Sequence, residues 1–272
     1  MRVYISVDME GITGVVSPTQ VRPGERDYER FRRIMTLEAN AAIRGALAGG
    51  ATAVAVNDSH GPMTNLLIED LHPAARLVSG SPKPHGMMQG IGPGFDAAYF
   101  IGYHSRHGTA ASVLDHTWSS ASIVDAQLNG RPVCEGDLNA GLAGEYDVPV
   151  ALVTGDETYC RQQQQFLGDD LPIVAVKRSI GRFAADSLSL AEAHRLIEEA
   201  AARALAAPRT PVRFDLPARI VLTFNHSGRA DMAALIPGSE RVDGLRVAYT
   251  AADAETLIRA WQALIALAGV SA

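Results

Sequence analysis

The stretch VYISVDMEG (residues 3–11) joins a short apolar run to two carboxylates, Asp8 and Glu10. Such a run, rich in β-branched and aromatic residues, predicts a buried β-strand. Side chains two residues apart on a strand point to the same side, so Asp8 and Glu10 would converge just past the strand end. Because like charges at this range repel each other, the pair predicts a positively charged partner between them.

The segments that follow repeat one pattern: a short apolar run, a loop with glycine, and a helical spacing of apolar residues. Residues 25–47 have the helical spacing and stop at Gly49-Gly50, a favoured helix end. Further strands are expected at residues 53–56, 97–101, 148–153 and 173–176. This alternation is typical of α/β proteins and predicts a three-layer core built on a mostly parallel sheet.

Two segments between these strands have patterns of their own. Residues 123–134 predict a hairpin, because Asn129-Gly130 supplies the positive φ angles that a two-residue turn requires. Residues 79–94 contain several prolines and glycines, which preclude a long regular element. We expect this second segment to be a connector rather than a lid.

The last third of the chain predicts a smaller C-terminal α+β portion. A capping box at residues 189–192 opens a helix to about residue 206, and the prolines in residues 208–211 break that pattern. Strands are expected at residues 220–224 and 245–249, and a final helix at residues 253–267. We therefore expect an α/β domain at residues 1–207 and the α+β portion at residues 208–272.

Composition limits the classes of partner. The 272 residues are 47% hydrophobic and 20% charged, with a net charge of -6 and no run of basic residues, which argues against nucleic acid or an anionic membrane surface. The N-terminal apolar run is too short for a signal peptide, and no run is long enough to cross a bilayer, so a cytoplasmic protein acting on small molecules or peptides is expected. Cys134 and Cys160 lack CxxC spacing, so nitrogen and oxygen would have to hold any metal.

Histidines and acids recur where expected strands end. Ligands of open α/β sheets bind outside the carboxyl ends of the strands, and the residues found there include Asp8, Glu10, His60, His104 and Glu135. Any one loop histidine would more often be a surface residue, so the argument rests on their coincidence of position. Carboxylate and imidazole ligands suit zinc or manganese. Five ligands exceed the usual set of one catalytic zinc, so a metal pair bridged by Asp8 or Glu10 is predicted.

Other polar residues have weaker signals. His116, in a short apolar context, suits proton transfer at neutral pH. Asn225 follows an expected strand and is a candidate substrate contact. Asp58 and Ser59 are expected to cap a helix or form a turn. The chain contains neither GxxxxGK[ST] nor GxSxG, which disfavours P-loop nucleotide binding and serine hydrolysis.

Six ordered motifs carry a family resemblance. They are SVDMEG (6–11), VNDSHG (56–61), LHP (71–73), GYHS (102–105), LDHT (114–117) and GDLNA (136–140), the last preceded by Glu135. Together they resemble the DppA-type D-aminopeptidases, the M55 metallopeptidase family. An ordered set of this kind is far more specific than any single motif.

The resemblance implies a di-zinc centre, with Mn²⁺ or Co²⁺ as substitutes. Asp8 would bridge the two ions, Glu10 and His60 would complete one site, and His104 and Glu135 the other. His116 falls at the position of the family's catalytic histidine. The family also implies a homodecamer of two stacked pentameric rings and the release of N-terminal D-residues, especially D-alanine, from short peptides.

These observations predict a di-zinc aminopeptidase whose α/β domain, residues 1–207, carries catalysis by a metal-bridged hydroxide. Two alternatives stay open at this point. The same ligands serve other di-metal hydrolases such as amidases or phosphoesterases, although Arg106 is the only clear basic residue near the motifs. A non-enzymatic peptide-binding protein would instead have a closed coordination shell around a structural metal.

Overall fold

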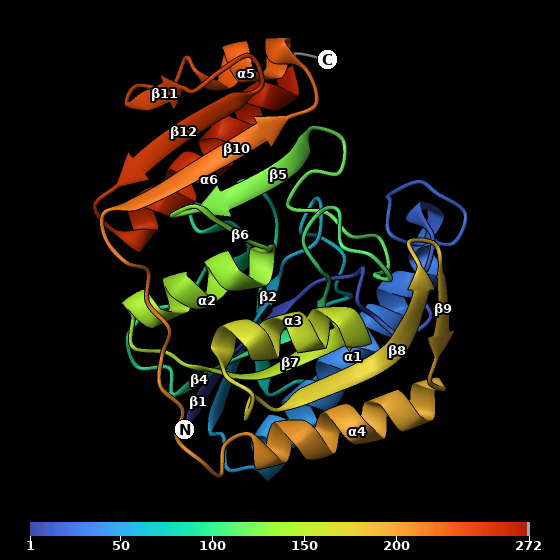
Figure 1. Cartoon of the computed structure of the whole chain (residues 1–272). Coiled ribbons are helices and arrows are strands. Elements are labelled where there is room, and N and C mark those ends of the chain that lie inside the picture. Colours follow the sequence, from blue (N-terminus) through green and yellow to red (C-terminus); the bar gives the residue numbers. More distant parts are fainter. Residues whose placement is uncertain (271–272) are drawn as a thin grey trace.

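Two β-sheets and the helices around them form the structure, a computed structural model that describes residues 1–270 (Figure 1). The strands of the first sheet are β1 (Arg2–Val7), β2 (Ala53–Asp58), β3 (Ala75–Val78), β4 (Ala97–Tyr103), β7 (Val150–Asp156), β8 (Ile173–Gly181) and β9 (Ala184–Ser187). Those of the second are β5 (Ile123–Leu128), β6 (Arg131–Pro132), β10 (Ala218–Phe224), β11 (Ser239–Arg241) and β12 (Arg246–Ala251). The helices are α1 (Tyr28–Ala48), α2 (Glu135–Glu145), α3 (Glu157–Leu167), α4 (Leu190–Arg203), α5 (Ser227–Ala233) and α6 (Ala254–Val270), with short 3-10 turns η1 (Pro18–Gln20) and η2 (Gly86–Met88).

The first sheet confirms the predicted α/β class. Its strand order is β3-β2-β1-β4-β7-β8-β9, and every neighbouring pair is parallel except β8 and β9. β1 lies between β2 and β4, with Val7 in register with Asp58 on one side and Ile101 on the other. The carboxyl ends of these three strands therefore meet at one edge of the sheet.

The faces of the first sheet contribute to two different cores, as the period of two along a strand requires. Val3, Ile5 and Val7 pack into a core with α1 and α4, which lie together on one side of the sheet (Figure 1). Tyr4, between them, faces the opposite core, which contains side chains of α2, α3, α6 and the second sheet. These are the predicted three layers.

The second sheet is antiparallel, in the order β11-β12-β10-β5-β6, and α5 and α6 pack against it. Asn129 and Gly130 have φ angles of 49° and 80°, so they form the predicted hairpin turn between β5 and β6. This hairpin precedes residue 207 in the sequence but pairs with β10 beyond it. The division of the chain after residue 207 stays a prediction.

Helices α2, α3 and α5 and the short strands β3, β9 and β11 were not expected from the sequence. α2 is the clearest case, because its segment contains several glycines, which have low helix propensity. A Cβ on Gly141 would lie 1.9 Å from the ring of Phe214, so close packing of the C-terminal segment requires glycine there. Tertiary contacts thus outweigh local propensity in this helix.

The helices that the structure describes include none with both the length and the apolar character needed to span a bilayer.

Candidate metal centre

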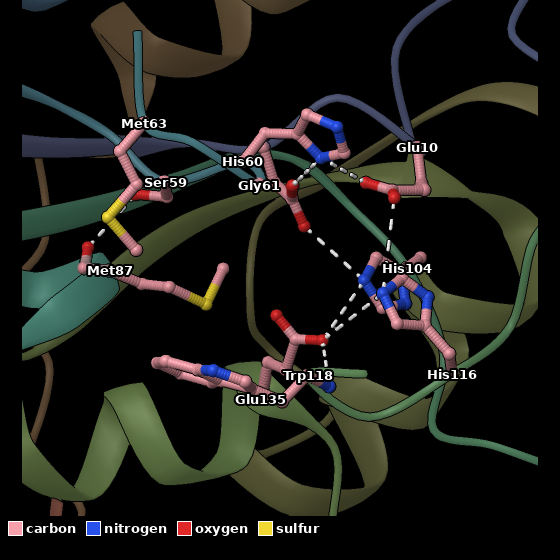
Figure 2. Close-up of a pocket in the computed structure, with 11 residues that line it drawn as sticks. Glu10, Ser59, His60, Gly61, Met63, Met87, His104, His116, Trp118 and Glu135 are labelled. Atoms are coloured by element: carbon pink, nitrogen blue, oxygen red, sulfur yellow. Dashed lines mark hydrogen bonds and ion pairs between the residues drawn. The ribbon is translucent and has the colours of Figure 1, made fainter. Parts of the chain in front are cut away.

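The five predicted ligands and His116 come together at the edge where β1, β2 and β4 end (Figure 2). Asp8 and Glu10 follow β1, His60 follows β2 and His104 follows β4. Glu135 does not simply follow the hairpin strand but is the first residue of α2. They line a buried pocket of about 110 Å³ together with Ser59, Gly61, Met63, Met87 and Trp118.

Asp8 lies between two histidines, and each of its carboxylate oxygens faces a different one. Oδ1 is 3.2 Å from His60 Nδ1, and Oδ2 is 3.4 Å from His104 Nε2. His60 Nδ1 is also 2.9 Å from Glu10 Oε2, and His104 Nε2 is 3.3 Å from Glu135 Oε1. The ligands therefore form two groups, one with Glu10 and one with Glu135, that share Asp8.

The histidine rings are held from behind by backbone carbonyl groups. A carbonyl oxygen only accepts hydrogen bonds, so the ring nitrogen that faces it carries the hydrogen. In a neutral ring the other nitrogen is then a lone-pair donor that points into the pocket. The three contacts are His60 Nε2 with Val21 O at 2.7 Å, His104 Nδ1 with Ser105 O at 3.0 Å and His116 Nδ1 with Leu114 O at 2.8 Å.

This arrangement fits a divalent cation. Lone pairs of the neutral rings would face carboxylate oxygens, and only a positive charge between them makes that favourable. Asp8 Oδ2 is buried and accepts no hydrogen bond from any residue in the range 1–270, so it has a free coordination position. The set contains imidazole and carboxylate without thiolate, as in hydrolytic zinc centres.

The pKa shifts of the predicted ligands show the same demand for positive charge. Burial and the neighbouring Glu10 carboxylate raise the pKa of Asp8 to about 7. Burial disfavours a charged His104, but the carboxylates of Glu135 and Asp8 outweigh it and raise its pKa to about 10. Burial likewise opposes the charge on His60, and Glu10 and Asp8 raise its pKa well above the usual value. The buried carboxylates thus favour positive charge at the positions of these two histidines.

His116 differs from His104 in its exposure, and from both His60 and His104 in the direction of its pKa shift. Its Nε2 lies 3.9 Å from Glu10 Oε1 and 3.8 Å from Glu135 Oε1, and its ring stacks on His104 with centroids 4.0 Å apart. Its side chain is 13% exposed, whereas that of His104 is 1% exposed. Burial and the positive charge of His104 lower the pKa of His116, which favours its neutral form.

Ligand spacing alone does not separate His116 from the metal ligands. His104, His116 and Glu135 offer ligand atoms within 4.8 Å of one another, and so do Asp8, Glu10 and His104. The direction of its pKa shift is what distinguishes it, because the pKa of His116 is lowered whereas those of His60 and His104 are raised. A neutral imidazole that also lines the adjoining cavity suits proton exchange with a substrate.

Two residues that sequence reasoning did not assign to the site hold the ligands in place. Lys177, at the end of the apolar run of β8, is 2% exposed, and its Nζ donates to the carbonyl oxygens of Glu10, Ile12 and Val15. A lysine directly after an apolar run is a signal that could have revealed it. Trp118 donates its backbone N–H to Glu135 Oε1 at 2.6 Å, and its side chain forms part of the pocket wall.

Gly102 allows the ends of β1 and β4 to approach each other. Its φ angle is 70°, and a Cβ at this position would lie 2.4 Å from Asp8 O. Gly11 donates its backbone N–H to Gly102 O at 2.7 Å. A side chain here would therefore separate Asp8 from His104, which follows Gly102 by two residues.

Other candidate residues lie outside the ligand cluster. Asp58 accepts hydrogen bonds from the backbone N–H groups of Asn65 and Leu66 at 2.5 and 2.7 Å, which fixes a turn. Asn225 donates from Nδ2 to Ala121 O at 2.9 Å and thus supports a loop beside the pocket. Its role as a substrate contact stays a prediction. The 79–94 segment is more than a connector, since its Met87 lines the pocket.

Comparison with known proteins agrees with this geometry. The family model for peptidase family M55, described as D-aminopeptidase, matches residues 1–263. The chain belongs to peptidase family M55. The resemblance inferred from the six motifs is thereby confirmed, and the M55 chain is identified as a hydrolase of peptide bonds.

Two relatives of this M55 chain cover nearly its whole length. A D-aminopeptidase of Bacillus subtilis (strain 168) is 42% identical over 274 residues, which is 98% of this chain and 96% of the relative. A solved structure, described as Zn-dependent D-aminopeptidase DppA from Bacillus subtilis, a self-compartmentalizing protease, superposes with a TM-score of 0.95 at 40% identity. The superposition covers 99% of this chain and 98% of the chain in that structure. The M55 chain thus has the same fold as that enzyme.

Proposed function

We propose that the chain is a zinc-dependent aminopeptidase that removes N-terminal residues, D-amino acids such as D-alanine, from short peptides. The observation that carries the proposal is the convergence of inward-facing histidine nitrogens on three buried carboxylates. Family membership and the zinc dependence of the solved relative support the same activity.

Two zinc ions per subunit would be held by the two ligand groups. Glu10 and His60 would hold one ion, His104 and Glu135 the other, and Asp8 would bridge them, since its two oxygens face different histidines. When bound, zinc supplies Lewis-acid chemistry, lowering the pKa of water towards neutrality and polarising a carbonyl group. Mn²⁺ or Co²⁺ would bind to the same side chains, because nitrogen and oxygen donors suit both ions.

The residues of the chain supply proton transfer and substrate orientation. His116 holds its hydrogen on Nδ1, bonded to Leu114 O, so Nε2 can accept a proton from the attacking water and return it to the leaving amine. The free amino group of the peptide would bind in the same pocket, beside a metal or an acid. Trp118, Met63 and Met87 cover the pocket with apolar surface and limit the access of bulk water.

We further propose that the subunits assemble into a decamer of two stacked pentameric rings. The solved relative is described as self-compartmentalizing. The β8–β9 hairpin of this chain carries two exposed apolar side chains near its turn, Ile180 and Phe183, which would favour burial against another subunit. Light scattering of the purified protein measures the assembly, and a monomeric mass would contradict it.

The activity is tested with zinc-loaded, manganese-loaded and metal-free protein on matched peptides that differ only in the configuration of the N-terminal alanine. We expect the zinc-loaded protein to release D-alanine and the metal-free protein to release none. Metal analysis should give two zinc ions per chain. Release of L-alanine alone would contradict the stereochemical part of the proposal, and equal activity without metal would contradict the zinc site.

A further inference from the structure

A second cavity opens directly from the metal centre. It has a volume of about 700 Å³, against about 110 Å³ for the inner pocket, and the two share Glu10, His60, His116 and Trp118 in their walls. The inner pocket has room for the ions and the reacting groups but not for the rest of a peptide. The part of the substrate beyond the scissile bond must therefore lie in the outer cavity.

The outer cavity is lined by side chains of both charges. Glu10 lies in the wall that it shares with the metal centre, and two arginines, Arg22 and Arg182, also line it. The charge of Arg182 is compensated, because its Nη1 donates to the carboxylate and the backbone carbonyl of Asp115. The guanidinium of Arg22, in contrast, forms no hydrogen bond or ion pair with any residue between 1 and 270.

The backbone at Arg22 is fixed beside the metal centre. The preceding residue, Val21, is buried, and its carbonyl oxygen accepts the hydrogen bond from His60 Nε2 at 2.7 Å. Pro23 follows and restricts the chain, and Glu25 donates its backbone N–H to Arg22 O at 3.2 Å. The uncompensated charge of Arg22 is thus carried by the residue next to Val21, whose carbonyl oxygen orients the predicted metal ligand His60.

We propose that Arg22 binds the C-terminal carboxylate of the substrate, so that the enzyme selects short peptides with a free C-terminus. This inference rests on the proposed aminopeptidase function. With the amino end of a short peptide in the inner pocket, its C-terminal carboxylate would lie in the outer cavity and match the uncompensated charge of Arg22. The planar guanidinium binds a carboxylate through two parallel hydrogen bonds, which gives specificity for this group over a neutral amide.

The test compares a D-alanyl dipeptide with its C-terminal amide on the zinc-loaded enzyme. We expect wild type to favour the free acid by about tenfold in kcat/KM, mainly through KM, as one charge-assisted contact in a partly exposed site would give. In Arg22→Gln the ratio of acid to amide should fall to about one. Arg26→Gln is the matched control, because Arg26 is an exposed arginine of the same loop that pairs with Asp27, and it should keep the preference.

Three results would overturn the role of Arg22: no preference in wild type, a preference retained in Arg22→Gln, or an equal loss in Arg26→Gln. An equal loss in Arg26→Gln would indicate that the preference comes from the overall positive charge of the loop and not from a contact with Arg22. If wild type cleaved neither peptide, the proposed function would fail separately from this inference. Calorimetric binding of the same acid and amide to wild type and Arg22→Gln would then decide whether Arg22 recognises the carboxylate.

Discussion

Replacing Lys177 with methionine should weaken both the fold and the metal centre. The ammonium group donates at 2.6, 2.9 and 2.8 Å to the carbonyl oxygens of Glu10, Ile12 and Val15, which form the loop after β1. Methionine has a similar length but no donor, so Lys177→Met would leave the carbonyl groups of Glu10 and Val15 unpaired, while Ile12 O would keep the backbone N–H of Val15. Because Glu10 is a predicted metal ligand, the loop that positions it would lose its main anchor.

The size of the effect follows from two opposing terms. Leaving buried carbonyl groups unpaired costs about 1–3 kcal/mol each. Removing the lysine also removes the cost of burying its charge. Burial lowers the pKa of Lys177 from 10.5 to about 8, and this shift corresponds to a cost of about 3 kcal/mol. Two such groups are opposed by this gain, so we expect a net loss of at most about 3 kcal/mol in the free energy of unfolding. Zinc affinity should fall by about 10–100-fold, as for other residues that orient a ligand.

The assays are urea denaturation of the metal-free protein and zinc titration against a competing chelator. Arg178→Met is the matched control, because Arg178 is on the same strand but exposed, and within residues 1–270 its side chain pairs only with Asp186. Such a surface pair contributes less than about 1 kcal/mol. If Lys177→Met matched the control in both stability and zinc affinity, the positioning role assigned to Lys177 would be refuted.

Three further predictions test the centre and its support. Asp8→Ala should abolish zinc binding, measured by metal analysis, and activity, while the circular dichroism spectrum stays native; a metal-free variant with full activity would refute the site. His116→Ala should retain zinc and lose at least about 10²-fold in kcat, and unchanged turnover would remove His116 from the mechanism. Burial raises the pKa of Glu38 from 4.5 to about 7, so the native state binds the proton more tightly than the unfolded state. The free energy of unfolding of wild type relative to Glu38→Gln should therefore fall by at most about 3 kcal/mol as pH rises from about 4.5 to about 7. Denaturation curves measure this difference, and the same pH dependence in both proteins would contradict it.

Much of the fold was evident from local patterns. The first crossover helix and the final helix were expected at residues 25–47 and 253–267 and are α1 (Tyr28–Ala48) and α6 (Ala254–Val270). The cap of α4 was also correct, since the Ser189 side chain accepts from Glu192 N. Helix α2 was missed because its glycines lower local propensity, and only tertiary packing explains them: a Cβ would meet Tyr159 at Gly136, Phe214 at Gly141 and the Val212 carbonyl group at Gly144.

The sequence by itself predicted the types of ligand and determined the strands that Asp8, His60 and His104 follow, because apolar periodicity marks a strand and the polar residues after it are visible without coordinates. Only the tertiary structure placed β2, β1 and β4 side by side and turned His60 and His104 towards different oxygens of Asp8. It also revealed Lys177, whose hydrogen-bond partners lie far from it in the sequence. Arg22 was revealed as well, as a cavity residue whose guanidinium has no partner within residues 1–270. Strand order and side-chain direction depend on contacts between distant segments, and no local pattern records those contacts.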